Sequence, residues 1–301
     1  MNPKFTSVLA SAGLLLAATI WGFSFVIVKD SLDYIGAFYM VAYRYTIAAV
    51  VMSLIFIKKW KLLSWDYIRQ GILTGLFLFL AYATQTVGCD YTTAGKNAFL
   101  TTFYVIMIPL LSWLLFKKRP RFYVFIAAAM SLSGIGLLAL GADDKGVNVG
   151  DLLTLICGVF FALHIIFTEK FNRRGGDPLF LTLLQFIFTA IAGWITAPFF
   201  EGSFPTTVAF TSRVVGSMMY LGLLSTMVGF SLQNIGLKYV QSSLASLFLG
   251  FESVFGILFS TFFLHERFTL KMLGGCTLIF AAVILAENGS LLFRQKCINV
   301  E

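Results

Sequence analysis

The stretch QTVGCDYTTAGKNAFLTTFY (residues 85–104) recurs in altered form 148 residues later as QNIGLKYVQSSLASLFLGFE (residues 233–252). The two copies align without a gap, and four identical pairs anchor the alignment: Gln85 with Gln233, Gly88 with Gly236, Tyr91 with Tyr239 and Phe103 with Phe251. Each copy lies at the junction between one long apolar run and the next. Similarity at a fixed offset indicates that the chain carries an internal repeat.

The composition is that of a protein that resides in a lipid bilayer. Hydrophobic residues make up 58% of the chain, charged residues make up 12%, and the mean hydropathy is +0.87. A soluble protein carries about 25% charged residues. The net charge of +8 does not indicate nucleic-acid binding, because the basic residues lie in short connectors between apolar runs.

Ten apolar runs are long enough to cross a bilayer as helices, for which about 20 residues suffice. They cover residues 8–28, 36–57, 71–89, 94–116, 122–140, 151–169, 179–199, 214–235, 240–264 and 270–288. The connectors are too short to form a soluble domain. The predicted fold class is therefore an all-α membrane protein with ten transmembrane helices.

Lysine and arginine residues predict the orientation of the chain. Connectors on the side of the N-terminus carry 15 of the 22, the opposite side carries six, and Arg44 lies inside a span. Cytoplasmic loops of membrane proteins are enriched in these residues. Both termini are therefore expected in the cytoplasm of a multi-pass cell-membrane protein, with the loop at 141–150, which contains Lys145, outside.

The repeat defines two five-helix units, residues 8–140 and 151–289. An odd number of spans reverses the second unit, so the halves are expected to be inverted repeats around a central cavity, an arrangement suited to alternating access. Gln85 is then near the outer end of its span and Gln233 near the inner end, which marks two equivalent gates. Alternatively, the repeated glycine and tyrosine only set a helix turn and an interfacial anchor.

Four segments resemble the EamA-type branch of the drug/metabolite transporter superfamily: IWGFSFVIVK (20–29), FYMVAYRY (38–45), AGKNAFLTTFYVIMIPLLSWLLFKKRP (94–120) and SLASLFLGFESVFGILFSTFFLHERFT (243–269). The resemblance covers nearly the whole chain. It implies ten helices, a central cavity and transport, commonly export, of amino acids or similar metabolites. Where family members often carry Glu-Pro in the ninth span, this chain has Glu252-Ser253.

Charged residues inside spans are costly and are functional candidates. Arg44 and Glu252 lie at overlapping depths, so they are expected either to form an ion pair that fixes helix packing or to take part in substrate or proton coupling. His164, near the middle of the sixth span, is either a hydrogen-bonded helix contact or a proton carrier. The GxxxG pair of Gly71 and Gly75 predicts a close helix contact.

Lys96 and Asn97 open the fourth span, where free N–H groups and the helix dipole favour anions. We expect them to hold a substrate carboxylate, although Lys96 could instead extend to the outer headgroups. The other residues expected to line a substrate cavity are Trp21, Tyr82, Gln85, Phe103 and Gln233.

Other functions are less consistent with this sequence. A membrane enzyme needs paired carboxylates, a metal motif or a nucleophile with its base, and the spans contain no such set. No metal or cofactor is expected, and a structural or receptor role would not explain an inverted repeat. Within transport, drug-like cations and nucleotide-activated sugars are the alternatives to amino acids and related zwitterions.

Overall fold

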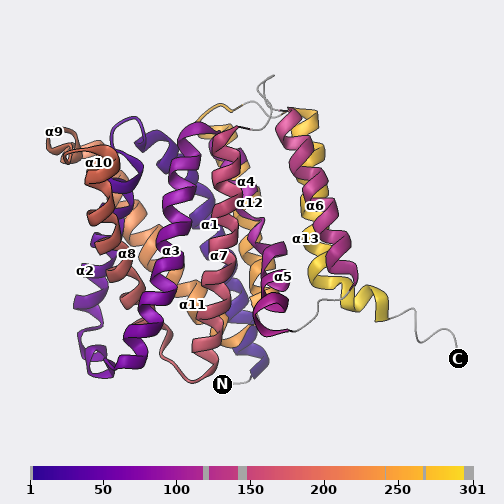
Figure 1. Cartoon of the computed structure of the whole chain (residues 1–301), viewed down its shortest axis with the longest axis horizontal. Helices are drawn as coiled ribbons and strands as arrows, with labels where there is room; N and C mark the ends of the chain where they lie inside the picture. Colours follow the sequence, from indigo (N-terminus) through magenta and orange to yellow (C-terminus); the bar gives the residue numbers. More distant parts are fainter. Residues whose placement is uncertain (1–2, 118–121, 142–147, 241, 267–268, 295–301) are drawn as a thin grey trace, which may run out of the picture.

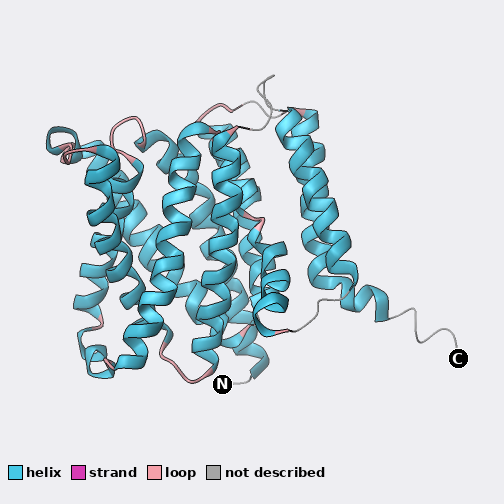
Figure 2. Ribbon diagram, in the orientation of Figure 1, coloured by secondary structure: helices cyan, strands magenta, loops and turns pink. Residues whose placement is uncertain are grey.

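The computed structural model describes residues 3–117, 122–141, 148–240, 242–266 and 269–294. These ranges form helices joined by short loops and contain no strand (Figures 1 and 2). In chain order the elements are α1 (Pro3–Ser31), α2 (Ala37–Ile55), the 3₁₀ helix η1 (Ile57–Leu62), α3 (Trp65–Tyr91), α4 (Ala94–Thr101), α5 (Tyr104–Phe116), α6 (Phe122–Gly141), α7 (Val149–Arg173), α8 (Pro178–Glu201), α9 (Thr206–Ala209), α10 (Ser212–Met219), the π-helix η2 (Tyr220–Val228), α11 (Gly229–Tyr239), α12 (Ser242–Phe263) and α13 (Leu270–Arg294).

Within these ranges, seven helical segments are long and apolar enough to cross a membrane. They are Val8–Ser31, Ala37–Ile55, Trp65–Tyr91, Ala94–Phe116, Val149–Arg173, Pro178–Glu201 and Ser212–Tyr239. The predicted spans at 122–140, 240–264 and 270–288 are helical as α6, α12 and α13 but fall outside this set. The chain is thus a multi-pass membrane protein, and the count of ten spans stays a prediction.

The predicted orientation depends partly on basic residues that lie outside the described ranges, namely Lys118, Arg119, Arg121, Lys145, Arg267 and Lys296. The outer faces of the helices carry exposed large apolar side chains such as Leu114, Phe199 and Leu270. Such faces suit contact with lipid tails.

Helices from the two sequence halves pack against each other in matched combinations. Exchanging the halves maps α1 onto α7, α3 onto α11, and α4 with α5 onto α12. The packing of α1 against α12 then has a counterpart in the packing of α7 against α4 and α5. In the same way, the packing of α3 against α7 has a counterpart in the packing of α11 against α1. α2 packs against α8, and α6 packs against α13 beside the main bundle (Figure 1).

The glycine shared by the two copies of the repeat lies at a crossing between the halves. A Cβ on Gly88 of α3 would lie 2.8 Å from Thr154 Oγ1 and 2.9 Å from Gly150 O on α7. A Cβ on Gly236 of α11 would lie 2.6 Å from Leu14 Cδ2 on α1. The absence of a side chain at both positions allows the helices to approach closely.

The GxxxG pair also lies at a close helix contact. Added Cβ atoms would lie 2.7 Å from Leu184 Cβ at Gly71 and 2.9 Å from Phe188 Cβ at Gly75. The predicted close contact of this segment is confirmed, and its partner is α8.

Two membrane segments are irregular along their length. In the first half, α4 ends at Thr101 and α5 begins at Tyr104. The Thr101 and Thr102 hydroxyls donate to Asn97 O at 2.8 Å and Phe99 O at 2.6 Å, which competes with regular helix hydrogen bonding. In the second half, the segment that starts with α10 continues through η2, and π-helical turns are frequent at functional sites.

The two ends of the helix bundle differ in their polar contacts. Lys29, near the end of α1, donates hydrogen bonds to Cys89 O at 2.8 Å and Asp90 O at 2.9 Å at the end of α3. We call this end, which lies opposite the N-terminus, the distal end (Figure 1). At the other, proximal end, Lys59 of η1 pairs with Asp177.

Asp177 caps the N-terminus of α8 in addition to pairing with Lys59. Its carboxylate accepts hydrogen bonds from the backbone N–H groups of Leu179 at 3.1 Å and Phe180 at 2.9 Å. Partial burial acts to raise the pKa of Asp177, but the hydrogen bonds from Lys59 and from these two N–H groups outweigh it, so the pKa lies below its usual value.

Candidate functional site

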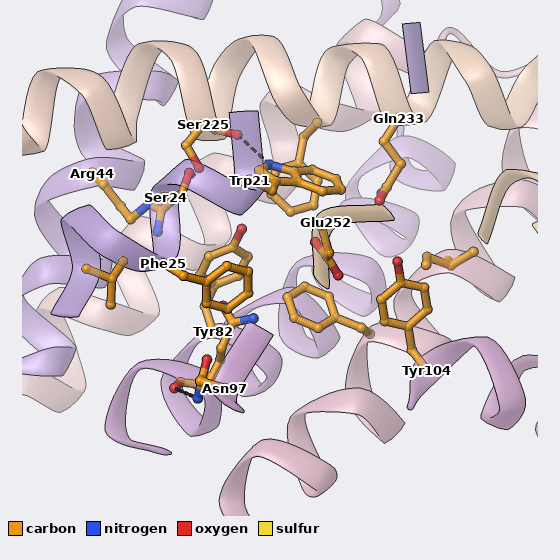
Figure 3. Close-up of a pocket in the computed structure, with 15 residues that line it drawn as sticks. Trp21, Ser24, Phe25, Arg44, Tyr82, Asn97, Tyr104, Ser225, Gln233 and Glu252 are labelled. Atoms are coloured by element: carbon orange, nitrogen blue, oxygen red, sulfur yellow. Dashed lines mark hydrogen bonds between the residues drawn. The ribbon is translucent and has the colours of Figure 1, made fainter. Parts of the chain in front are cut away.

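A cavity of about 520 Å³, counting space open to solvent, lies between the two sequence halves (Figure 3). Six of its 15 described lining residues are aromatic, namely Trp21, Phe25, Tyr82, Tyr104, Phe161 and Phe230. Its polar residues are Ser24, Arg44, Gln85, Asn97, Ser225, Gln233 and Glu252. Both halves therefore contribute to one site, and its described lining residues include one basic and one acidic side chain.

Arg44 reaches the cavity from α2 and is 1% exposed. Its Nε donates to Thr226 Oγ1 at 2.9 Å, and its Nη2 donates to Ser225 Oγ at 2.8 Å and to Leu221 O at 3.5 Å, all on η2. The guanidinium carbon lies 4.7 Å from the centre of the Tyr82 ring. Hydroxyl groups, a carbonyl group and a ring face thus surround the charge.

Glu252 lies on α12, is 5% exposed and points into the same cavity (Figure 3). The Tyr104 hydroxyl is close enough to interact with its carboxylate electrostatically but does not meet hydrogen-bond geometry. The sequence left open whether Arg44 and Glu252 pair. Across the described residues the four ion pairs involve other side chains, so these two charges do not form one.

The distal part of the wall contains Gln85 and Asn97. Gln85 Nε2 donates to Thr101 Oγ1 at 3.1 Å, and Asn97 Nδ2 donates to Gln85 O at 3.1 Å. Asn97 Nδ2 also donates to Thr154 Oγ1 of the second half at 2.8 Å. Asn97 Oδ1 is buried and has no hydrogen-bond partner within the described ranges. The side chain thus links the halves and leaves an acceptor unused.

Trp21 fixes the α1 wall of the cavity against η2. Its Nε1 donates to Ser225 O at 2.8 Å, as Figure 3 shows, and its ring centre lies 5.0 Å from that of Phe230. A Cβ on Gly229 would lie 2.5 Å from Nε1, so the indole occupies space left by the glycine. Gln233, also in the wall, donates from Nε2 to Asn234 Oδ1 at 3.4 Å.

Lys96 does not line this cavity but forms a buried ion pair at the distal end. Its Nζ lies 2.6 Å from Asp151 Oδ2, and both side chains are 3% exposed. Asp151 also accepts hydrogen bonds from Thr92 Oγ1 and Asn148 N, each at 3.0 Å. A carboxylate of the second half thus occupies the position at which the sequence suggested a substrate carboxylate, and the side chain does not extend to the headgroups.

His164 and Phe103 also lie outside the cavity lining. His164 Nε2 is 3.3 Å from Gln185 Oε1, which accepts a second hydrogen bond from Asn234 Nδ2 at 3.4 Å. The histidine is therefore linked to the cavity through this network and Gln233, and its ring centre lies 5.8 Å from that of Phe230, which lines the cavity. Phe103 packs against α7, because a Cβ added to Gly158 of that helix would lie 3.3 Å from the Cβ of Phe103.

In the part of the chain that the structure describes, no group of three or more His, Cys, Asp or Glu side chains could hold a metal ion.

The pattern of the EamA-like transporter family matches the chain twice, over residues 8–140 and 148–287. The chain belongs to the EamA-like transporter family. Its members are membrane transporters of the drug/metabolite superfamily and are not enzymes. The two matches also mean that this transporter contains two copies of the family repeat.

Relatives of this EamA-like transporter cover nearly its whole length. An uncharacterized transporter from Archaeoglobus fulgidus is 34% identical over 283 residues, which are 92% of this chain and 85% of the relative. The uncharacterized transporter YoaV from Bacillus subtilis is 24% identical over 280 residues, or 91% and 94% of the two chains. A solved crystal structure matches with a TM-score of 0.71 at 19% identity and covers 96% and 98% of the chains, which shows a shared fold.

Sequence reasoning missed several residues that define the site. Ser225 and Thr226 hold Arg44, and Tyr104 adds an unpaired hydroxyl to the wall. Hydroxyl residues in apolar runs are common, so no sequence signal distinguished these three. Asp151 was detectable as a helix start, since Asn148 and Asp151 have capping-box spacing, but its pairing with Lys96 was not.

Proposed function

We propose that this EamA-like transporter exports small zwitterionic metabolites, such as amino acids, by alternating access of the central cavity. In this proposal the ten apolar runs form ten transmembrane helices in two inverted repeats, residues 8–140 and 151–289. Both termini lie in the cytoplasm of the cell membrane, and the distal end faces outward.

The observation that carries the proposal is the composition of the cavity. It is lined from both halves, and it presents one buried cation and one buried carboxylate that do not neutralise each other. A zwitterion carries the complementary charges in one small molecule. Aromatic walls suit the apolar part of such a substrate.

Contacts across the distal end support a gating role for the boundary between the halves. Besides Lys96 and Asp151, Glu266 of the second half accepts hydrogen bonds from Ala94 N at 2.7 Å and Gly95 N at 3.0 Å at the start of α4. Opening the cavity at this end requires these contacts to separate. In the proposal, the matched helix contacts between the halves support an equivalent opening at the proximal end.

The alternative substrates fit the cavity less well. A nucleotide-activated sugar carries two phosphates, which need several cations, whereas Arg44 is the one lysine or arginine among the lining residues that the structure describes. A drug-like cation would use Glu252 but would leave Arg44 beside a second positive charge. A zwitterion uses both.

Export and proton coupling are further parts of the proposal. Glu252 is a buried carboxylate in the substrate cavity and is therefore the candidate group for a coupled proton. A transported amino acid should accumulate against its gradient when a pH gradient is imposed. Glu252→Gln should remove this driven accumulation.

The test is flux of labelled solutes into proteoliposomes that contain the purified protein, with and without a pH gradient. The panel holds the amino acids, organic cations and a nucleotide sugar. Ser24→Trp should block flux by filling the cavity, whereas Leu16→Trp, on the exposed face of the same helix, should not. No solute flux above that of empty liposomes, or flux unaffected by Ser24→Trp, would contradict the proposal.

A further inference from the structure

Arg44 and Glu252 are two opposite charges in one cavity, and neither has a counter-ion within the described ranges. Burial of a charge is unfavourable unless it is paired or well hydrogen-bonded. Since α2 and α12 hold these side chains on different parts of the wall, the cavity separates two charges that could otherwise have neutralised each other. The arrangement leaves both charges available to a ligand.

The guanidinium of Arg44 is held in place by hydrogen bonds but retains free hydrogen-bond donors. Nε and Nη2 donate to groups on η2, while Nη1 donates no hydrogen bond to any described residue. The Tyr82 ring at 4.7 Å further restricts its orientation. A planar guanidinium held in this way binds carboxylates well, because its N–H groups match the spacing of two carboxylate oxygens.

Acceptors for a cation lie elsewhere in the same wall. The Glu252 carboxylate faces the cavity and has no ion-pair partner among the described residues, and Asn97 Oδ1 is a buried acceptor without a hydrogen-bond partner in those residues. Buried polar atoms in native proteins are nearly always satisfied, so unused ones call for an explanation. An ammonium group has three donors and no acceptor, which matches these oxygens.

We propose that Arg44 binds the carboxylate of an amino-acid substrate and that Glu252, assisted by Asn97 Oδ1, binds its ammonium group. The substrate side chain then packs on the aromatic wall formed by Phe161 and Phe230, which favours apolar amino acids. This inference rests on the proposed transport function and names the groups that select the substrate.

The arrangement predicts selection for molecules that carry both charges. An amine without a carboxylate leaves Arg44 buried beside a second cation, and an acid without an amine leaves Glu252 unpaired. Sites with buried polar groups reject analogues that lack the matching group. Each analogue should therefore bind about tenfold to a hundredfold more weakly than the amino acid, as for the loss of hydrogen bonds to a charged group.

The experiment is calorimetric titration of the full-length, detergent-solubilised protein with leucine, 3-methylbutylamine and 4-methylpentanoate. The last two lack the carboxylate and the amine of leucine, respectively. Arg44→Gln should reduce the preference for leucine over the amine to less than about threefold and leave the preference over the acid unchanged. Glu252→Gln should do the reverse. Arg69→Gln and Glu169→Gln, the same substitutions away from the cavity, should match the wild type.

The wild-type comparison tests the inference even if a variant fails to fold. Equal affinity for leucine and either analogue overturns it, as does the absence of binding by any of the twenty amino acids. If one variant loses both the preference for leucine over the amine and the preference for leucine over the acid, the assignment of the carboxylate to Arg44 and of the ammonium group to Glu252 is also contradicted. If proteoliposomes then carry another solute in a manner blocked by Ser24→Trp, the transport function stands and only the zwitterion site fails.

Discussion

Substitution of Lys96 by methionine separates the ion pair seen in the structure from a role in substrate binding. Lys96 Nζ and Asp151 Oδ2 are 2.6 Å apart and both side chains are 3% exposed. Breaking a buried pair by removing one partner costs about 3–5 kcal/mol, because the remaining charge is left buried. We therefore expect Lys96→Met to destabilise the protein and not merely to weaken transport.

The structure indicates where in this range each single variant falls. In Lys96→Met, the Asp151 carboxylate keeps hydrogen bonds from Thr92 Oγ1 and Asn148 N, so a loss of about 3 kcal/mol is expected. In Asp151→Asn, the Lys96 ammonium loses its one charged acceptor among the described residues, and a loss of about 5 kcal/mol is expected.

The double variant Lys96→Met/Asp151→Asn removes both charges and supplies the control. It should lose about 5 kcal/mol, less than the about 8 kcal/mol expected if the two substitutions acted independently, which corresponds to a coupling free energy of about 3 kcal/mol. The free energies of unfolding are measured by titration with sodium dodecyl sulfate in mixed micelles. If Lys96→Met is as stable as the wild type but binds acidic substrates more weakly, the ion pair is not structural and the substrate interpretation returns.

Three further predictions concern packing, pH and the cavity wall. Gly22→Ala should lower stability by about 1–3 kcal/mol through overpacking, because its Cβ would lie 2.4 Å from Phe255 Cβ. Gly274→Ala is the control, since a Cβ there would have no atom within 4 Å and should not lower stability. Thermal unfolding of the two purified variants compares them. The pKa of Asp177 is lowered in the fold, so its contribution to stability is present above its ordinary pKa of 3.8 and is lost as pH falls further. Unfolding curves measured from pH 3 to 7 should therefore show a weaker dependence of stability on acid in Asp177→Asn than in the wild type. Identical curves for the two proteins would contradict this. Trp21→Phe removes the hydrogen bond to Ser225 O at 2.8 Å and should cost about 0.5–1.5 kcal/mol while slowing flux in proteoliposomes; unchanged stability and flux would show that η2 does not need this contact.

The sequence predicted the parts of the fold that depend on repeated local patterns. Apolar runs predicted the helices, and the GxxxG pair at Gly71 and Gly75 predicted a close helix contact that the structure places against α8. The repeat was visible because Gly88 and Gly236 each have to admit a neighbouring helix, so the same residue occurs at equivalent positions. Within the described residues, the predicted spans at 122–140, 240–264 and 270–288 are not among the seven segments that are long and apolar enough to cross a membrane, so ten spans stay a prediction.

The site was predictable in part, for a physical reason. Charged and amide residues stand out in apolar runs, and Arg44, Glu252, Gln85, Asn97 and Gln233 do line one cavity. Pairing cannot be deduced in the same way, since it depends on the rotation of helices far apart in the chain. The pairing of Lys96 with Asp151, across the boundary between the halves, needed the three-dimensional arrangement.

Alternating access of the cavity is the central claim, and thiol accessibility tests it most directly. Gln85→Cys and Gln233→Cys place single cysteines in the distal and proximal parts of the cavity wall, in a background without the four native cysteines. Protein of known orientation in liposomes is exposed to a membrane-impermeant thiol reagent on one side at a time. Each cysteine should be modified from either side, and a transported amino acid should slow both reactions. Modification of both positions from the same single face, whatever solute is present, would contradict alternating access.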